Sequence, residues 1–328
     1  MPRVNIRDIV APHFWNTFNS KKTHQIDKGG RGSTKTSKNG IKISLTCEEF
    51  EQCSAVIFRR YQNTLRNSVY KEMKRALKRL HLQEEIDYTA FKSPLEIHLS
   101  NKNNIYFAGG DDYEKVKGMI DEDTPIKILW FEELTEFDSP DDIEQIIATF
   151  TRGNDDWFIV LYSFNPPKNK FHWVNQWVEK MAQRKDCIVT QTDYRTVPEK
   201  WLGKIFIEQA EEMKKNDEER YKWIYLGEVI GLEGLIYNPD LIEYVPEDYI
   251  EKNNINILYI DFAIDSGHQT SATTCGAYGY GNDGYWYLLD TYYYSPHEKP
   301  NKKAPSELSK DIFNFELAIN KKFKAGTD

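Results

Sequence analysis

Short apolar runs separated by polar segments make up the first two thirds of the chain. Alternating or continuously apolar stretches predict strands at residues 55–58, 95–99, 104–108, 126–131, 157–162 and 187–191. Residues 38–50 and 68–82 instead repeat their apolar positions with a helical period, and 199–223 is charged and helical in pattern. Strands that alternate with helices in this way predict an α/β fold with a largely parallel sheet.

A second set of strand patterns follows a stretch that glycines and prolines interrupt. Alternation predicts a strand at 257–262, and Gly281-Asn282-Asp283-Gly284 is a turn signal between two strand-like arms, 271–280 and 285–294. We therefore expect a large domain, a linker and a smaller domain, with the bounds 1–235, 236–254 and 255–328.

Composition narrows the class of protein. Hydrophobic residues make up 40% and charged residues 29% of the 328 residues, which is typical of a folded globular protein and excludes a disordered one. The sequence contains neither a membrane-spanning apolar run nor a secretory signal, and its four cysteines lack C-x-x-C spacing. We expect a reduced protein of the cytoplasm, with no structural zinc and no membrane partner.

The charge distribution bears on nucleic acids as partners. A net charge of −8 argues against a protein whose whole surface binds nucleic acid, but phosphate contact needs positive charge only where the strand runs. The amphipathic segment 68–82 places lysines and arginines between its apolar positions. Its basic face is either an ordinary solvated helix face or a DNA-facing one, and the sequence leaves both open.

The glycine-rich stretch from Lys28 to Ser37 has the form of a phosphate-binding loop. In the pattern G-x-x-x-x-G-K-[ST], backbone N–H groups cradle phosphate oxygens, the Lys reaches the β- and γ-phosphates, and the hydroxyl binds Mg²⁺. The predicted nucleotide-binding residues of this loop are Gly29, Gly30, Arg31, Gly32, Ser33, Thr34, Lys35 and Thr36.

Two features depart from the loop pattern. Thr34 stands where a Gly normally precedes the Lys, and a positive φ at that position would cost about 1–3 kcal/mol. Residues 24–27, which should form the strand leading into the loop, have low β propensity. A flexible surface loop rich in Gly, Ser and Lys therefore stays open as an alternative.

Polar residues follow two of the predicted strands. Glu132 and Glu133 end the strand at 126–131, as in a Walker B segment, where the first carboxylate holds the Mg²⁺ shell and the second orients the attacking water. Asn165 follows the next strand and is placed to sense the γ-phosphate, while Arg31 offers a cation to the transferring phosphoryl group. The alternatives are a helix N-terminus for the acidic pair and a simple Asn-Pro turn.

As an ordered set, Gly-Gly-Arg-Gly-Ser, Trp-Phe-Glu-Glu, Ser-Phe-Asn-Pro and a later strand ending in Asp resemble the large terminase subunit of tailed phages, of the prophage PBSX type. The resemblance implies a P-loop (RecA/ASCE-like) ATPase domain followed by an RNase H-like nuclease domain. It implies a motor that hydrolyses ATP with Mg²⁺ and drives double-stranded DNA into a prohead. The implied partners are a small terminase subunit, a portal protein and further copies of the chain in a ring, in the cytoplasm of a bacterial host.

The resemblance also assigns roles to individual residues. Lys35, Arg31 and Glu133 are assigned to catalysis, Thr36 and Glu132 to Mg²⁺, and Asn165 to a coupling motif that begins at Ser163.

In the second domain the resemblance assigns Asp261 and Asp290 as ligands of a divalent metal, Mg²⁺ or Mn²⁺. A two-metal nuclease needs carboxylates that converge on ions about 4 Å apart. The family has a third acidic ligand, and none is evident before Asp328. We therefore expect an incomplete nuclease domain, in a truncated or decayed form or in an excerpt of a longer chain.

Three other functions stay open. The chain could be a nucleotide-binding remnant without catalysis, which Thr34, Glu132 and the missing third acid favour. It could be another P-loop motor such as a helicase, against which the Asp261 strand and its hairpin argue. The last alternative is a structural member of a phage assembly whose nucleotide site is vestigial.

Overall fold

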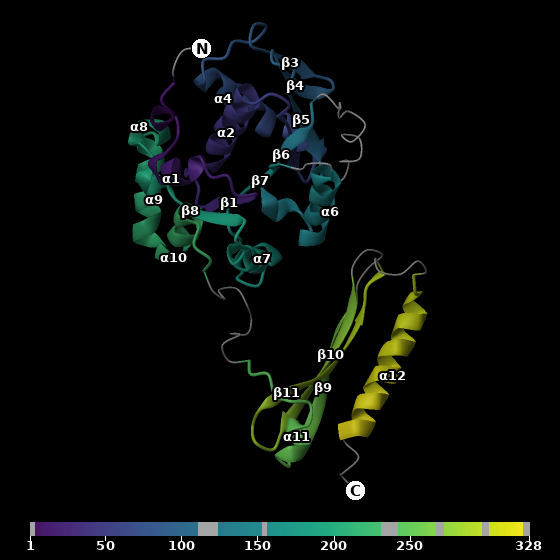
Figure 1. Ribbon diagram of the computed structural model, residues 1–328. Helices are drawn as coiled ribbons and strands as arrows, with labels where there is room; N and C mark the ends of the chain where they lie inside the picture. Colours follow the sequence, from purple (N-terminus) through teal and green to yellow (C-terminus); the bar gives the residue numbers. More distant parts are fainter. Residues whose placement is uncertain are drawn as a thin grey trace. The chain divides into compact units, whose positions relative to one another are not determined.

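The computed structural model describes residues 4–110, 124–152, 156–230, 242–266, 272–296 and 302–323 (Figure 1). The chain divides into two compact units, Met1–Tyr237 and Asn238–Asp328. The linker expected at 236–254 lies partly outside the described residues. In the part of the chain that the structure describes, no helix combines the length and apolarity needed to cross a membrane.

The first unit is built on an eight-stranded sheet with the order β3-β4-β5-β2-β6-β7-β1-β8. Its strands are β1 (His24–Gly29), β2 (Ser54–Arg59), β3 (Tyr88–Lys92), β4 (Leu95–Leu99), β5 (Asn104–Gly109), β6 (Ile126–Glu132), β7 (Ile159–Phe164) and β8 (Cys187–Thr192). Neighbours from β5 to β8 pair in parallel, and β3 and β4 extend one edge in antiparallel pairing. The predicted α/β fold with a largely parallel sheet is therefore confirmed, although the sequence pattern did not indicate β3.

Helices cover both faces of this sheet. The longer ones are α2 (Lys35–Glu49), α4 (Val69–Arg79), α6 (Pro140–Thr151), α7 (Trp173–Ala182) and α9 (Lys204–Asn216). Shorter elements are η1 (Ile6–Asp8), η2 (Pro12–Phe14), α1 (Trp15–Phe18), α3 (Gln62–Leu65), η3 (Leu134–Glu136), η4 (Tyr194–Thr196), α8 (Glu199–Leu202), α10 (Glu218–Tyr221) and η5 (Lys222–Leu226), a single π-helical turn. The helical pattern at 199–223 is confirmed by α8 to α10.

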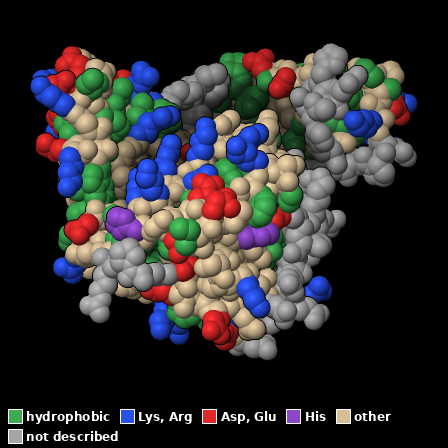
Figure 2. All heavy atoms as spheres, turned by 90° about the horizontal axis from the view of Figure 1, so that it is seen from above, with side chains coloured by type: hydrophobic (Ala, Val, Ile, Leu, Met, Phe, Trp, Pro, Cys, Tyr) green, Lys and Arg blue, Asp and Glu red, His purple; other side chains and the backbone are tan. Residues whose placement is uncertain are grey.

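The predicted basic amphipathic helix is confirmed as α4. Its apolar residues are buried, while Lys71, Arg75, Lys78 and Arg79 are exposed. Figure 2 looks onto the molecule from above Figure 1, the side on which α4 lies, and Lys and Arg side chains gather on part of that face. The exposed basic residues of α4 thus face solvent, away from the buried apolar side of the helix.

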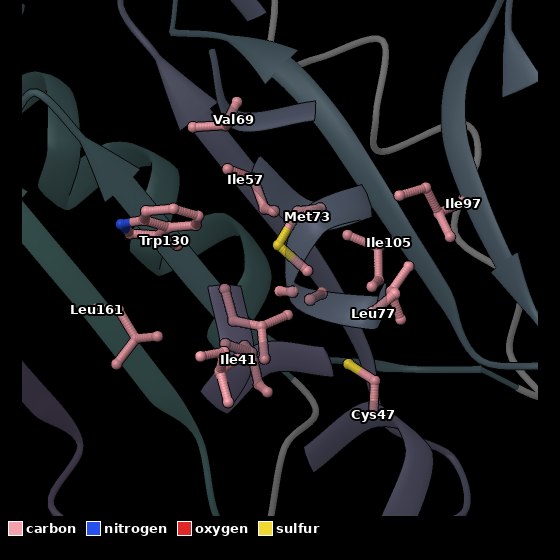
Figure 3. Packing of buried hydrophobic residues seen from close by; sticks show 14 of the residues in the cluster. Ile41, Cys47, Ile57, Val69, Met73, Leu77, Ile97, Ile105, Trp130 and Leu161 are labelled. Atoms are coloured by element: carbon pink, nitrogen blue, oxygen red, sulfur yellow. The ribbon is translucent and has the colours of Figure 1, made fainter. Parts of the chain in front are cut away.

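The core on the α2 and α4 side joins both helices to the middle of the sheet. Ile41 and Met73 pack there with Ile57 and Trp130 from the strands (Figure 3). On the other face, α6 and α7 bury a second apolar cluster against β2, β6 and β7. Apolar clusters therefore cover both faces of the middle of the sheet, as is usual for parallel strands.

The strand β1 is built from residues that seldom form strands. It lies between β7 and β8, and its polar side chains are paired: Lys38 donates to Asp27 over 2.8 Å, Lys42 donates to Gln25 over 2.7 Å, and His24 is hydrogen-bonded to Tyr162. The doubt that low β propensity raised is wrong here, because parallel partners on both sides and these buried bonds outweigh intrinsic preference.

The second unit is a three-stranded antiparallel sheet with one long helix. Its elements are α11 (Tyr249–Lys252), β9 (Ile257–Asp265), β10 (Thr273–Gly281), β11 (Trp286–Tyr294) and α12 (Pro305–Phe323), with the strand order β11-β10-β9. Phe315 of α12 contacts the rings of Phe262 and Tyr292, so the helix packs on the sheet face that carries them. The predicted strand and hairpin are confirmed, whereas no sequence pattern indicated α12.

Candidate nucleotide site

The ends of β1, β6 and β7 meet at one edge of the first sheet. These strands are neighbours and run in parallel, so Lys28 pairs with Phe164 and Glu132 pairs with Ser163. The loop after β1, the acidic pair after β6 and the polar residues after β7 therefore converge. This is the edge at which parallel α/β sheets bind ligands.

The glycine-rich loop between β1 and α2 is held from two sides. A side chain on Gly29 would place its Cβ 1.9 Å from the carbonyl oxygen of Thr192, and one on Gly30 would come equally close to the carbonyl oxygen of Tyr225. Only glycine fits between the end of β8 and the η5 turn. The loop leads directly into α2, so its amide groups and the helix N-terminus form a site suited to phosphate.

Lys35 is buried and holds the loop closed on itself. Its Nζ donates to the carbonyls of Gly29 (3.0 Å) and Gly30 (3.2 Å), to the Ser33 hydroxyl (3.0 Å) and to Oδ1 of Asn165 (3.2 Å). Burial lowers the pKa of Lys35 to about 8, and the carboxylates of Glu132 and Glu133 oppose that shift. Lys35 thus joins the loop to Asn165, the residue that follows β7.

Glu132 connects the acidic pair to the loop. The hydroxyl of Thr36 donates to its Oε1 over 2.6 Å, and the hydroxyl of Ser163 donates to its Oε2 while accepting from the indole N–H of Trp130. Burial and then the charge of Glu133 raise the pKa of Glu132 to about 7, while the two hydroxyl donors lower it. The carboxylate of Glu132 and the hydroxyls of Thr36 and Ser163 therefore lie next to one another at the end of β6.

These oxygen donors fit Mg²⁺, which is usually bound by one or two carboxylates together with waters and substrate phosphates. Among the described residues no group of three or more His, Cys, Asp or Glu is placed to hold a metal by itself. A protein-only cage is not needed for that kind of Mg²⁺ site, so Thr36 and Glu132 suit it.

Two residues of the site adopt the left-handed backbone conformation. Thr34 has φ 62° and Glu133 has φ 54°. The positive φ considered for Thr34 is therefore present, and its buried hydroxyl has no hydrogen-bond partner among the described residues. Such conformations in non-glycine residues cost of order 1–3 kcal/mol and persist where the surrounding structure enforces them.

Arg31 lies at the exposed side of the loop. Its amide N–H donates to the carbonyl of Ile224 over 2.8 Å, and its positive charge contributes to lowering the pKa of Lys35. Gly32 and Ser33 complete the loop, with the Ser33 hydroxyl donating to the carbonyl of Gly30 over 2.9 Å.

Sequence reasoning missed two segments that contact the loop. The Nε2–H of His13 donates to the Ser33 carbonyl over 3.0 Å, and the Thr196 hydroxyl donates to its Nδ1. The η5 turn also lies against the loop, and its Trp223 donates to the Pro166 carbonyl over 3.0 Å. No motif in the sequence points to His13. The segment after η5 does carry a sequence signal, the glycine Gly227, which has φ 68° and would clash with Gly29 if it carried a side chain.

The second unit does not bring its two predicted metal ligands together. Asp261 pairs with Tyr278, which pairs with Leu288, whereas Asp290 pairs with Ala277, opposite Phe262. Directly paired residues point to the same face of a sheet, so the two aspartates lie on opposite faces. A bulge between Ala277 and Tyr278 adds a residue to β11 and moves Asp290 to the α12 side. The structure therefore does not bring Asp261 and Asp290 together on one face of this sheet, and their assignment as metal ligands stays a prediction.

Comparison with known proteins agrees with the geometry of the first unit. The family model described as phage terminase large subunit matches residues 21–228. The chain is 32% identical over 239 residues to the terminase large subunit of Bacillus phage SPP1, covering 70% of this chain and 56% of that protein. It is 24% identical over 260 residues to the PBSX phage terminase large subunit of Bacillus subtilis (strain 168), covering 74% of this chain and 57% of that protein.

Solved structures share the fold. The large terminase of a thermophilic bacteriophage, in complexes with ADP and with ATP-gamma-S, matches with a TM-score of 0.52 and 19% identity, covering 96% of this chain and 75% of that chain. The present chain spans little more than half the length of the two curated relatives. The family match, which extends over most of the first unit, shows that the chain belongs to the phage terminase large subunit family.

Proposed function

We propose that this chain hydrolyses ATP with Mg²⁺ and uses the reaction to move double-stranded DNA into a prohead. The observation that carries the proposal is the convergence of three strand ends: Thr36 is bonded to Glu132 over 2.6 Å and Lys35 to Asn165 over 3.2 Å. Phosphoryl transfer is catalysed mainly by positioning and by electrostatic stabilisation, and these residues supply both.

Each residue has a role that follows from its place. Lys35 exchanges the carbonyls of Gly29 and Gly30 for the β- and γ-phosphates and supplies positive charge there. Thr36 and Glu132 offer oxygens beside the phosphates for Mg²⁺, which when bound neutralises charge on the β- and γ-oxygens. Glu133 orients the attacking water.

Two further residues serve the same site. Asn165 contacts Lys35 and is placed to report on the γ-phosphate, and Arg31 adds positive charge at the open side of the loop. The backbone N–H groups of Gly32, Ser33 and Thr34 contribute to the phosphate cradle. The complexes of the thermophilic-phage terminase with ADP and ATP-gamma-S support a nucleotide as the ligand of this fold.

The exposed basic face of α4 is the DNA contact that we propose for the first unit. Lys71 and Lys78 are exposed and lie two helical turns apart on the same side of α4. The net charge of the whole chain is −8, so this positive charge is local. Phosphate contact depends on such local positive charge and weakens with salt. We also propose, from family membership, three kinds of protein partner: a small terminase subunit, a portal protein and further copies of the chain in a ring. These partners would meet the chain in the cytoplasm of a bacterial host.

The second unit is proposed as part of a metal-dependent nuclease domain of the RNase H type. Asp261 is the residue of this chain that supports it. With Asp290 on the other face of the sheet, the further ligands of Mg²⁺ or Mn²⁺ have to come from elsewhere.

The test is ATP hydrolysis by the purified chain with Mg²⁺, with and without double-stranded DNA. Lys35→Ala and Glu133→Gln are expected to lower turnover at least about 100-fold. Glu144→Gln, an exposed carboxylate on α6, is the matched control and is expected to leave turnover unchanged. Wild-type hydrolysis no faster than that of Glu133→Gln would overturn the ATPase proposal. Tight ATP binding without turnover would instead favour the nucleotide-binding remnant, to which the strained Thr34 also points.

A further inference from the structure

The loop that follows the acidic pair contacts two consecutive arginines, the last residue of β2 and the residue after it. Arg59 at the end of β2 donates from Nε to Oε2 of Glu136 over 3.2 Å and from Nη2 to Oε1 of the same carboxylate. Arg60 donates from Nη2 to Asp138 over 2.6 Å. Because β2 and β6 are adjacent and parallel, both contacts join the ends of two neighbouring strands.

The two arginine contacts differ in burial and in geometry. The Arg59 and Glu136 side chains are 14% and 29% exposed, whereas those of Arg60 and Asp138 are 24% and 69% exposed. A guanidinium that makes two hydrogen bonds to a largely buried carboxylate fixes the direction of that side chain. A single contact to an exposed carboxylate contributes little to stability. The Arg59–Glu136 pair is therefore the one that holds the loop.

Glu136, which Arg59 contacts, is hydrogen-bonded to the backbone of Glu133. The amide N–H of Glu136 donates to the carbonyl of Glu133 over 2.8 Å. Glu133 itself is left-handed, with φ 54° and ψ 56°, and a non-glycine residue keeps that conformation only when its surroundings enforce it. Phe137 is 2% exposed, and its carbonyl accepts from the Trp173 indole over 3.0 Å, so the loop is fixed on its other side as well.

We propose that Arg59 is a positioning residue for ATP hydrolysis. Through Glu136, whose amide N–H donates to the Glu133 carbonyl, it keeps Glu133 in the left-handed conformation directly after the buried Glu132. The inference rests on the proposed ATPase function. Nucleotide binding uses residues 29–36, which Arg59 does not touch among the contacts that the structure describes, so loss of Arg59 changes turnover and spares affinity.

The experiment compares Arg59→Gln, Arg59→Lys and the matched control Arg60→Gln in the full chain. The readouts are kcat and KM for ATP with Mg²⁺, the Kd of a fluorescent ADP analogue, and thermal unfolding. Arg59→Gln is expected to lower kcat by about 10- to 100-fold, since small misplacements of a catalytic group have effects of that size. KM and Kd are expected to change by less than about twofold, Arg59→Lys to be intermediate and Arg60→Gln to lose less than about threefold.

A double variant separates positioning from a general structural effect. Arg59→Gln combined with Glu136→Gln is expected to be no slower than Arg59→Gln alone, because both changes remove one interaction. The proposal is overturned if the double variant shows the product of the two single losses in kcat, or if Arg60→Gln loses as much kcat as Arg59→Gln. It is also overturned if Arg59→Gln loses ADP affinity in parallel with kcat, or keeps the wild-type kcat.

If the wild-type chain hydrolyses no ATP, the proposed function fails separately from the contact. Hydrogen exchange in segment 133–138 then reads the contact alone. Faster exchange in Arg59→Gln than in Arg60→Gln supports Arg59 as the residue that holds the loop, and equal exchange overturns it.

Discussion

Two pairs of carboxylates, Glu132 with Glu133 and Asp261 with Asp290, lie in sheets of different kinds. β6 runs parallel to both of its neighbours, so its end meets the other strand ends at one edge of the sheet. β9 and β11 are antiparallel to β10. Side chains alternate between the two faces along each strand, so one extra residue moves the side chains that follow it to the other face. One bulge is therefore enough to separate the second pair, whereas the parallel strand ends bring Glu132 of the first pair to Thr36 and Ser163.

The two pairs also differ in how they are supported. Glu132 is 6% exposed and accepts from two hydroxyls, and Glu133 follows it in an enforced conformation. Asp261 and Asp290 are exposed, and Asp290 accepts from the amide of the next residue, Thr291. Burial and two hydroxyl donors fix the direction of the Glu132 carboxylate, and burial raises its pKa. The first pair is thus prepared for chemistry in a way that the second is not.

The largest expected difference between the pairs is in ATP hydrolysis. Glu132→Ala removes a carboxylate beside the proposed Mg²⁺ position and is expected to lower kcat/KM by about 100-fold or more. Asp290→Ala is expected to change it by less than about twofold. Steady-state hydrolysis at several Mg²⁺ concentrations measures both. Equal effects of the two changes would remove the distinction between the pairs.

A second expected difference is in the pH dependence of stability. The pKa of Glu132 is raised from 4.5 to about 7, so the folded state binds more protons than the unfolded state between these pH values. The stability that this group contributes is therefore present below pH 4.5 and is lost as pH rises through 7. Glu132→Gln is expected to raise the free energy of unfolding by about 2–3 kcal/mol at pH 8, and by much less near pH 5.

Urea denaturation of the full chain at the two pH values measures this difference. Asp290→Asn is the matched control, and its effect is expected to stay within about 0.5 kcal/mol at both pH values, as for most surface changes. A Glu132→Gln variant that is less stable than wild type at pH 8 would contradict the raised pKa.

The smallest expected difference concerns backbone strain in the two units. Thr34 in the loop and Asn254 before β9 both have positive φ, 62° and 51°. Thr34→Gly relieves a β-branched residue of this conformation and is expected to stabilise by about 1 kcal/mol, after the entropy cost of glycine. Asn254→Gly is expected to gain less than about 0.5 kcal/mol, because Asn tolerates the left-handed region.

Thermal unfolding of the two variants measures the gain. ADP affinity of Thr34→Gly is expected to be retained, because the backbone N–H groups of the loop remain. A stabilisation by Asn254→Gly as large as that by Thr34→Gly would show that strain is not concentrated at the nucleotide site.

Local pattern in the sequence was enough for the frame of the first unit. Apolar runs of strand length and the helical period at 68–82 predicted β2, β4 to β8 and α4, because each element must bury one face whatever its neighbours are. The order of the glycine-rich loop, the acidic pair and Asn165 predicted a shared site, because parallel strands put their ends together. Lys35 and Thr36 likewise reach this site because they are the first two residues of α2, directly after the loop.

Other features depended on partners far away in the chain. The polar strand β1 forms because β7, β8 and the lysines of α2 satisfy it. The contacts of His13 with the loop and of Arg59 with Glu136 join segments that no spacing relates. Propensity and motif describe neighbours in sequence, and these contacts arise between elements that only the folded sheet brings together.

The sequence by itself determined which residue types could hold a nucleotide and in what order they occur. Only the tertiary structure decided that Glu132 is buried against Thr36 and Ser163, and that Asp290 turns away from Asp261. The physical reason is that residue identity sets what a side chain can bind, whereas strand register sets which side chains share a face. A bulged position carries no signature in the sequence, so the loss of the second pair could be seen only in the folded hairpin.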